Sequence, residues 1–397
     1  MKPVAAALAI LLLVSAAAAR AENAPGVTAT SIKLGQTMSY TGVAAPIAGP
    51  LGRAEQAYLR MINDRGGVNG RTIALESLDD GFVPERSLEL VKRMVEQDHV
   101  AAIFGAFATP PNLAIRPYLN KNGIPDLFVT TGDDWVIDRK GYPWTIGGVP
   151  VFRVEAQIFA RYILINMPAA KVGLLRSIDP MGDSYSTGLR QALGADYYRI
   201  VAKEEPVAVG AADADAQWKA LHDAGATAVI VAAGPEVAAK VIARAHDGDW
   251  HPQLFINFAA SASALAEAGR DKAKGIITAN SYLDPTDPRW TEDGTSKPFN
   301  EFVAKYLPNA TADIGYYLAG YVSSQAVVQV LKQCGNDLSR RNIMLQATNL
   351  KNFHPTGLLP GVTFFTSRTK YLPIVEAALT RFDGRHWVQM GDVMAGF

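Results

Sequence analysis

The chain has 397 residues, and its 38 basic and 38 acidic side chains leave no net charge. Because 49% of the residues are apolar, the chain can bury a large core, and its length predicts two domains. The absence of a basic run argues against binding to nucleic acid or to an anionic membrane, and a single cysteine, Cys334, excludes an intrachain disulfide and a cysteine-based metal site.

The first 21 residues predict a secretory signal peptide. Lys2 precedes an apolar stretch, Val4–Val14, which is shorter than the roughly 18 residues that a membrane span needs. Ala19-Arg20-Ala21 then forms an A-x-A cleavage pattern. We therefore expect cleavage before Glu22 and an exported, soluble protein.

From Ile32 onward, short apolar runs alternate with segments of helical spacing, which predicts an α/β fold. The predicted strands are 32–38, 71–78, 100–104, 127–129, 171–175, 198–201, 227–231, 254–258, 275–278 and 362–365. One predicted helix begins near residue 54, and two more begin at Pro84 and Pro110. The other main predicted helices are 152–167, 182–193, 235–246, 298–306 and 313–332. Pro117 is expected to kink or shorten its helix, and Asp383-Gly384 predicts a hairpin near the end of the chain. This order of elements predicts two α/β domains with a cleft between them.

Two neighbouring strands of this pattern end in small and hydroxyl residues. The strand at 100–104 runs into Gly105–Thr109, and the strand at 127–129 runs into Thr130, Thr131 and Gly132. In a parallel sheet both ends lie at the carboxyl edge, where open α/β proteins bind ligands. Pro110 and Pro111 suit the first turn of a helix, so Thr109 is expected beside free backbone N–H groups. This arrangement is suited to a carboxylate and needs neither a metal nor a catalytic base.

Several longer segments together resemble the leucine/isoleucine/valine-binding type of solute-binding protein, which serves ABC importers. They are IKLGQTMSYTG, AYLRMINDRGGVNGRTIALESLDD, IFGAFATPPNLAIRPYLNKNGIP, SYLDPTDPRW, LKQCGNDLSRRN and RFDGRHWV. The resemblance covers nearly all of the chain after the signal peptide, and its order and spacing are specific. It implies a type I periplasmic-binding-protein fold with two Rossmann-like lobes joined by three hinge crossovers. Lobe one would comprise 27–149 and 280–360, and lobe two 150–279 and 361–397.

The resemblance also implies a function and a set of ligand-binding positions. The chain would be a periplasmic, monomeric carrier without a cofactor, which delivers a small carboxylate ligand to a membrane permease. The implied lobe-one positions are Ser39, Tyr40, Phe107, Ala108, Thr109, Thr130, Thr131 and Gly132. Tyr282, an aromatic residue near a strand end, is added to them. The implied lobe-two positions are Met181, Tyr185, Asn257 and Phe258, with a further position near Gly234. Aromatic residues near the strand ends, including Trp135, could clamp an apolar ligand, with ordinary packing as the alternative.

One departure from the family pattern bears on the ligand. Amino-acid binders of this family hold the ligand ammonium with a carboxylate after the strand that is 254–258 here, but residues 256–261 contain no acid. Because a buried ammonium without a charged partner is strongly disfavoured, we hypothesise a ligand without an α-amino group, such as an aromatic or branched aliphatic acid. Binding of a branched-chain amino acid stays open, because other side chains could replace the missing acid. The replacement would be Asp133, Asp134, Asp179 or Asp183, and Ser261 or Asn257 could also solvate an ammonium.

Two other classes of function are alternatives. Gly182-Asp183-Ser184 and the later Asp383-x-x-His386 imitate the Ser and Asp/His blocks of GDS-type hydrolases, although such a Ser block belongs near the start of the mature chain. A ligand-sensing receptor module could use the same fold. The 6 histidines show no metal-binding spacing, so no metal is expected.

Overall fold

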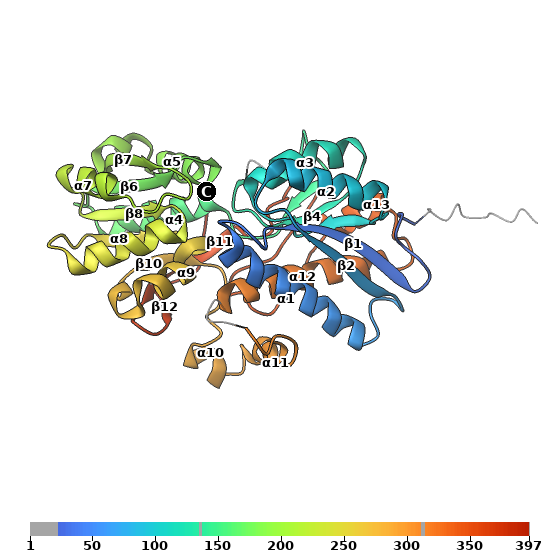
Figure 1. The fold of residues 1–397 in the computed structure, drawn as a ribbon. Coiled ribbons are helices and arrows are strands. Elements are labelled where there is room, and N and C mark those ends of the chain that lie inside the picture. Colours follow the sequence, from blue (N-terminus) through green and yellow to red (C-terminus); the bar gives the residue numbers. More distant parts are fainter. Residues whose placement is uncertain (1–22, 135–136, 311–313, 397) are drawn as a thin grey trace, which may run out of the picture.

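The computed structural model describes residues 23–134, 137–310 and 314–396. These residues form two lobes, each with a central sheet and helices on both faces (Figure 1). The predicted signal peptide, 1–21, and Trp135 lie outside the described residues. Within the described part of the chain, no helix combines the length and apolar character that crossing a membrane requires.

The sheet of the first lobe is wholly parallel, with strand order β2-β1-β3-β4-β5. Its strands are β1 (Ser31–Met38), β2 (Thr72–Asp79), β3 (Ala102–Phe104), β4 (Asp126–Val129) and β5 (Thr145–Gly147). The helices of this lobe are α1 (Ala45–Asp64), α2 (Pro84–Glu96), α3 (Thr109–Lys121), α10 (Pro288–Glu292), α11 (Lys297–Tyr306), α12 (Ile314–Cys334) and α13 (Arg340–Ala347). All residues of β3 and β4 are buried, as expected for central strands of a parallel sheet.

The second lobe has a larger, mixed sheet of order β12-β11-β10-β9-β8-β6-β7, and β13 also pairs with β11. Its strands are β6 (Val172–Ser177), β7 (Val201–Val207), β8 (Ala228–Ala232), β9 (Gln253–Ile256), β10 (Ile277–Asn280), β11 (Glu376–Phe382), β12 (Trp387–Gln389) and β13 (Met394–Ala395). Its main helices are α4 (Phe152–Asn166), α5 (Pro180–Leu193), α6 (Tyr197–Ile200), α7 (Asp215–Asp223), α8 (Pro235–Asp247) and α9 (Phe258–Ala268).

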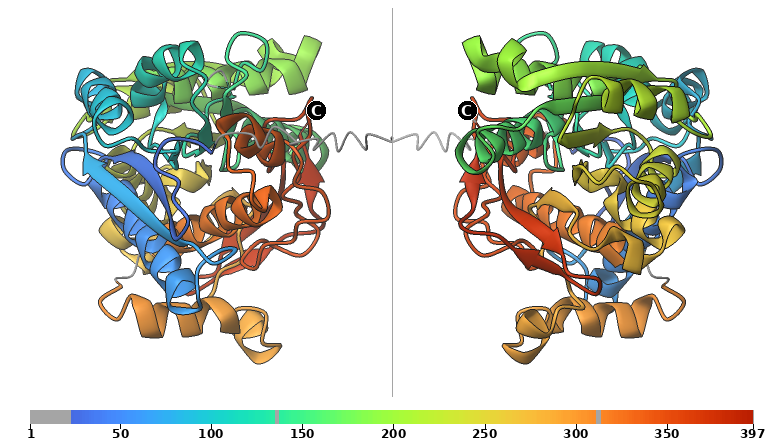
Figure 2. Two further views of the ribbon diagram at one scale, coloured as in Figure 1. Left: turned by 90° about the vertical axis from the view of Figure 1, so that its right-hand side faces the viewer. Right: turned by 90° about the vertical axis from the view of Figure 1, so that its left-hand side faces the viewer.

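The chain passes between the two sheets more than once. It leaves the first sheet after Gly147, returns to the first lobe after Asn280, and enters the second sheet again at Glu376. The C-terminal strands, red in Figure 2, therefore lie beside α4, the first helix of the second lobe. This connectivity confirms the predicted two-lobed fold with three crossovers.

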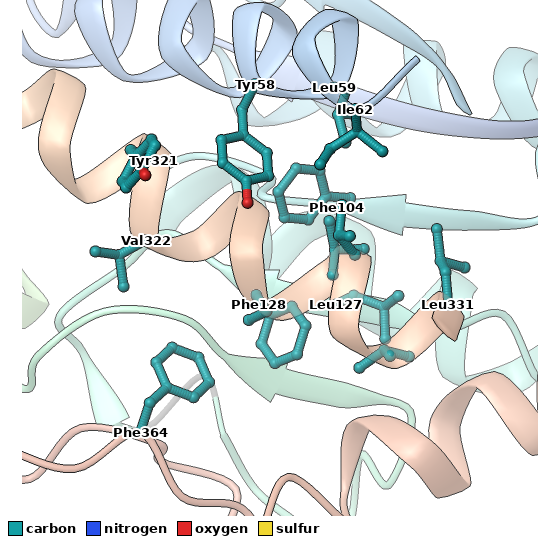
Figure 3. Close-up of a cluster of buried hydrophobic side chains, with 14 of the residues drawn as sticks. Tyr58, Leu59, Ile62, Phe104, Leu127, Phe128, Tyr321, Val322, Leu331 and Phe364 are labelled. Atoms are coloured by element: carbon teal, nitrogen blue, oxygen red, sulfur yellow. The ribbon is translucent and has the colours of Figure 1, made fainter. Parts of the chain in front are cut away.

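Aromatic packing joins distant parts of the chain in the core of the first lobe (Figure 3). The ring centroids of Tyr58 on α1 and Tyr321 on α12 lie 5.1 Å apart, and those of Phe128 on β4 and Phe364 lie 5.7 Å apart. Phe364 belongs to residues 361–374, which we expected in lobe two. Instead, this segment contributes buried side chains to the core of lobe one.

Two predicted strands are wrong. Residues 198–201 were expected as a strand, but Tyr198 is exposed on the short helix α6, and β7 starts only at Val201. Residues 362–365 pack as irregular chain without strand pairing. Pro117 does not shorten its helix, because α3 continues through it to Lys121; this proline lies on the exposed face, where water can solvate the carbonyl that loses its donor.

Helices α1 and α12 pack closely at Gly320, which gives a first prediction. A Cβ atom at Gly320 would lie 2.5 Å from the carbonyl oxygen of Leu51 and 3.0 Å from Ala54 Cβ. We therefore expect Gly320→Ala to lower the free energy of unfolding by about 1–3 kcal/mol, as overpacking does. Gly315 on the same helix faces open space, so Gly315→Ala should be neutral or slightly stabilising. Equal urea midpoints for the two variants would contradict this interpretation.

Candidate functional site

A cavity of about 230 Å³ lies between the two lobes at the carboxyl ends of the parallel strands. We call it the interlobe cavity. Its first-lobe wall includes Leu51, Phe82, Phe107, Ala108, Thr109, Thr130, Thr131, Gly132, Tyr282 and Tyr316. Its second-lobe wall includes Phe152, Asp179, Met181, Val209, Gly234, Glu236 and Phe258. The lining is mainly apolar, with a few polar groups on each wall.

Main-chain hydrogen bonds hold the ends of β3 and β4 side by side. Ala108 N donates to Thr130 O over 2.9 Å, and Thr130 N donates to Ala106 O over 2.9 Å. The chain reverses sharply before α3, where Ala108 has a φ of +69°, a conformation that is uncommon for a residue with a side chain. This turn places the start of α3 next to the residues that follow β4.

Polar groups with unused hydrogen-bonding capacity meet at this point. Thr109 Oγ1 and Thr131 Oγ1 lie 2.5 Å apart, and both side chains are almost fully buried. Thr109 is the first residue of α3, so its N–H has no acceptor within the helix, and the prolines that follow have no N–H. Among the described residues, the buried hydroxyls of Thr130 and Tyr282 have no hydrogen-bond partner. The arrangement offers several donors to an anion, which is what a bound carboxylate requires.

Aromatic rings form much of the remaining wall. Phe152 and Phe258 approach each other with ring centroids 6.1 Å apart, and Phe107 and Phe82 line the first lobe. Met181 adds a flexible apolar side chain from α5. An apolar ligand body would therefore be buried among rings and aliphatic groups.

The second-lobe wall carries two carboxylates, Asp179 and Glu236. Asp179 caps α5, because its Oδ1 accepts hydrogen bonds from Gly182 N at 3.0 Å and from Ser177 Oγ at 2.5 Å. Glu236 lies in the first turn of α8 and is half-buried. From the sequence, Asp179 was expected only as an alternative, and Glu236 was missed because the acid was expected after β9. The position of Glu236 two residues beyond Gly234 was the available signal.

Four of the predicted ligand-binding residues do not line the interlobe cavity. Each has its polar group in an interior hydrogen bond. Ser39 Oγ donates to Asp80 Oδ1 over 2.7 Å, and Tyr40 OH shares hydrogen bonds with Ser77 and Gln56 at 2.7 Å. Tyr185 OH donates to Glu155, and Asn257 Oδ1 caps α9 by accepting from Ala260 N at 2.9 Å. The remaining predicted positions, from both lobes, lie on the cavity wall.

The other acids that could have replaced the missing carboxylate also lie outside the lining. Asp134 forms an ion pair with Arg153, and Asp183 pairs with Arg176 at 3.1 Å. Asp133 Oδ1 accepts a hydrogen bond of 3.5 Å from Ser184 Oγ. Burial raises the pKa of Asp134, although the neighbouring Arg153 opposes this effect.

The residues of the hydrolase alternative serve other purposes. Ser184 is fully buried in α5, and its Oγ is bonded to Asp133. Asp383 Oδ1 accepts from the main-chain N–H groups of Arg385 and His386, both at 2.7 Å, and closes the hairpin between β11 and β12. The hairpin prediction is thus confirmed. Among the described residues, no three His, Cys, Asp or Glu side chains come together as a metal site.

A buried carboxyl group supports the wall of the second lobe from behind. Glu155 on α4 is fully enclosed; it accepts from Phe258 N at 3.0 Å and also from the hydroxyl of Tyr185. Thr278 Oγ1 and Ala279 N add longer contacts of 3.4 Å. Burial raises the pKa of Glu155 to about 8, so this group is mostly protonated at neutral pH.

The first lobe contains a similar group. Glu55 on α1 accepts from Gln36 Nε2 at 2.5 Å and from Ser323 Oγ at 2.8 Å. Its Oε1 lies 2.8 Å from where a Cβ atom on Gly105 would sit, so the chain between β3 and the Thr109 turn passes close to this carboxyl. Burial raises the pKa of Glu55 to about 8 as well.

The two lobes touch beside the cavity. Tyr316 on α12, a lining residue of the first lobe, donates its hydroxyl to Ala259 O on α9 over 2.6 Å. Ser263 Oγ lies 3.3 Å from the same hydroxyl. The structure therefore has its lobes in contact beside a cavity that is still partly open to solvent.

Comparison with known proteins agrees with this architecture. The profile of the family described as "Periplasmic binding protein" matches residues 31–385. An "Amino acid binding protein" of Pseudomonas aeruginosa is 22% identical over 315 residues, covering 77% of this chain and 79% of that protein.

Solved structures show the same fold. A branched chain amino acid ABC transporter protein from Thermus thermophilus with bound valine has a TM-score of 0.81 at 17% identity, over 93% of this chain and 98% of that one. A solute binding protein of an ABC transporter from R. palustris, in complex with benzoate, has a TM-score of 0.76 at 18% identity, over 92% and 97%. The chain belongs to the periplasmic binding protein family, within its leucine/isoleucine/valine-binding-like type I branch.

Proposed function

We propose that this protein is the solute-binding component of an ABC importer, and that it captures a small carboxylate ligand in the interlobe cavity. The observation that carries the proposal is the group of donors around Thr109 and Thr131 in an otherwise apolar cavity, together with the hydroxyls of Thr130 and Tyr282, which have no partner in the described part of the chain. A carboxylate would accept from these groups while its apolar body lies among the aromatic rings.

In the proposed cycle, the lobes open and close about the crossovers, and the ligand is enclosed between them. The closed form is the one a membrane permease would recognise, because only then do the surfaces of the two lobes lie in fixed relation. The protein would act as a periplasmic monomer after removal of residues 1–21, and would release its ligand chemically unchanged.

The ligand classes under consideration are aromatic acids, branched aliphatic acids and branched-chain amino acids. The related solved structures with valine and with benzoate support this range. The absence of an acid after β9 favoured ligands without an amino group. The carboxylates of Asp179 and Glu236 on the second-lobe wall change this expectation, because they could bind a ligand amino group or another hydrogen-bond donor.

The proposal is tested by a thermal-shift screen of the purified protein with leucine, phenylalanine, benzoate and coumarate. A ligand present at about 100 times its dissociation constant stabilises the folded state by about 2.7 kcal/mol. That corresponds to a shift of several degrees in melting temperature. Leucinamide and benzamide are the matched controls, because they keep the apolar body and lack the carboxylate. Failure of every carboxylate, or equal shifts with the amides, would contradict the proposal.

A further inference from the structure

We infer that the ligand is bipolar: its carboxylate lies on the first lobe, and a hydrogen-bond donor, either a hydroxyl or an ammonium, faces Asp179 and Glu236 on the second lobe. This inference rests on the proposed function, because it assumes that the interlobe cavity holds an organic acid. It adds the orientation of that acid and the chemistry of its far end.

Helix ends give the two walls opposite electrostatic character. The N-termini of α1 and α3 reach the first-lobe wall, and neither helix has an acidic residue in its first turn. Each such terminus carries about half a positive charge, which favours an anion nearby. This wall therefore attracts the carboxylate end of a ligand.

Each of the three helices that start at the second-lobe wall has an acidic side chain at its N-terminus. Asp179 caps α5, and Glu236 lies in the first turn of α8. The third, α9, donates its first N–H to the buried Glu155. An anion on this side would meet carboxylates in place of free helix ends, so a second acidic group on the ligand is disfavoured here.

Unused hydrogen-bonding capacity shows what each wall lacks. On the first lobe, the buried hydroxyls of Thr130 and Tyr282 have no partner among the described residues. On the second, Glu236 takes part in no ion pair or hydrogen bond with the described chain, and the hydrogen bonds of Asp179 all use Oδ1. The first wall thus has donors to offer, and the second has acceptors.

A half-buried carboxylate without a partner is costly once the cavity closes and water leaves. A donor on the ligand would remove this cost by bonding to Glu236 or to Asp179 Oδ2. A wholly apolar acid would leave both acceptors unpaired, so it should bind less tightly than an analogue with a donor at the far end.

The test uses calorimetric titration of the purified protein with two series of acids. The aromatic series is benzoate, 4-hydroxybenzoate and 4-(aminomethyl)benzoate, and the aliphatic series is 4-methylpentanoate, 5-hydroxypentanoate and 5-aminopentanoate. In the series that binds, we expect a donor-bearing acid to bind at least about tenfold more tightly than its parent, as hydrogen bonds to charged groups do. The two donor-bearing acids distinguish a hydroxyl from an ammonium as the natural group.

Substitutions identify the groups responsible. Glu236→Gln and Asp179→Asn remove the charges and keep the shapes, and asparagine can still cap α5. In one or both variants, the preference for the donor-bearing acid should fall to less than about threefold. Asp183→Asn is the matched control, because Asp183 is also in the first turn of α5 but lies outside the cavity lining. It should leave the preference unchanged.

The outcomes separate the inference from the proposed function. Equal affinities for parent and donor-bearing acids, or a preference that survives both substitutions, would overturn the inference and leave carboxylate binding intact. If no acid of either series binds and the leucine, phenylalanine and coumarate of the first screen also fail, the proposed function falls as well.

Discussion

The double substitution Thr109→Val/Thr131→Val is expected to weaken carboxylate binding by about 100-fold or more, which calorimetric titration would measure. The two hydroxyls lie 2.5 Å apart at the cavity wall, and each can turn toward a bound anion. Valine keeps the shape of threonine but donates no hydrogen bond, so the carboxylate would lose both donors while its apolar contacts remain.

The double variant separates binding from folding better than either single one. The two hydroxyls are partners, so replacing both leaves neither hydroxyl alone, and the remaining cost is that Asp133 N loses its acceptor, Thr131 Oγ1, at 3.1 Å. An unpaired buried N–H costs about 1–3 kcal/mol, so the melting temperature without ligand should fall by a few degrees, and affinity is compared at a temperature where the variant is folded. Thr72→Val, at an exposed hydroxyl on β2, is the control and should bind as the unaltered protein does. Unchanged affinity in the double variant would place the carboxylate elsewhere.

The pairing of Thr109 with Thr131 was predictable, because it depends on topology. Both residues follow central strands, and parallel neighbours end at the same edge of a sheet. Strand periodicity identified these strands from their short apolar runs. The resemblance to solute-binding proteins then placed the same turns in the cleft between the lobes.

The roles of individual polar side chains at the strand ends were not predictable in the same way. Ser39 and Asn257 also sit where strands end, but their side chains turn inward to bond with Asp80 and with the start of α9. Residue spacing fixes the position of a turn but not the direction of its side chains. Glu236 was missed for the converse reason, since its place in the cavity depends on which first-lobe residues lie across the cavity from the start of α8.

Replacing Glu155 by alanine is expected to lower the free energy of unfolding by about 3–5 kcal/mol at pH 6. The substitution empties a closed site and leaves Phe258 N and the hydroxyl of Tyr185 without their acceptor. Because Phe258 also lines the interlobe cavity, ligand affinity should fall too. Urea unfolding and ligand titration of the same variant would measure both effects.

Glu155→Gln isolates the ionisation of this group. The pKa of Glu155 is raised by burial from 4.5 to about 8, so its stabilising effect is complete below about pH 4.5 and is lost as the pH rises to about 8. Over that range the unaltered protein should lose about 1.4 kcal/mol of stability per pH unit through this proton. Glutamine does not titrate, so the variant should lose this part of the slope and gain stability relative to the unaltered protein as the pH rises.

Glu55→Gln is the matched comparison, because the pKa of Glu55 is also raised to about 8 by burial. It should remove a similar part of the slope. Only Glu155 bonds to a residue of the aromatic wall, Phe258, so only Glu155→Gln should also alter how ligand affinity changes between pH 6 and pH 9.

An unchanged stability slope in Glu155→Gln would mean that this carboxyl is already ionised at neutral pH, held by its main-chain and hydroxyl donors. In that case the glutamine variant should be less stable than the unaltered protein at every pH in the range, because it would replace a charged acceptor with a neutral one.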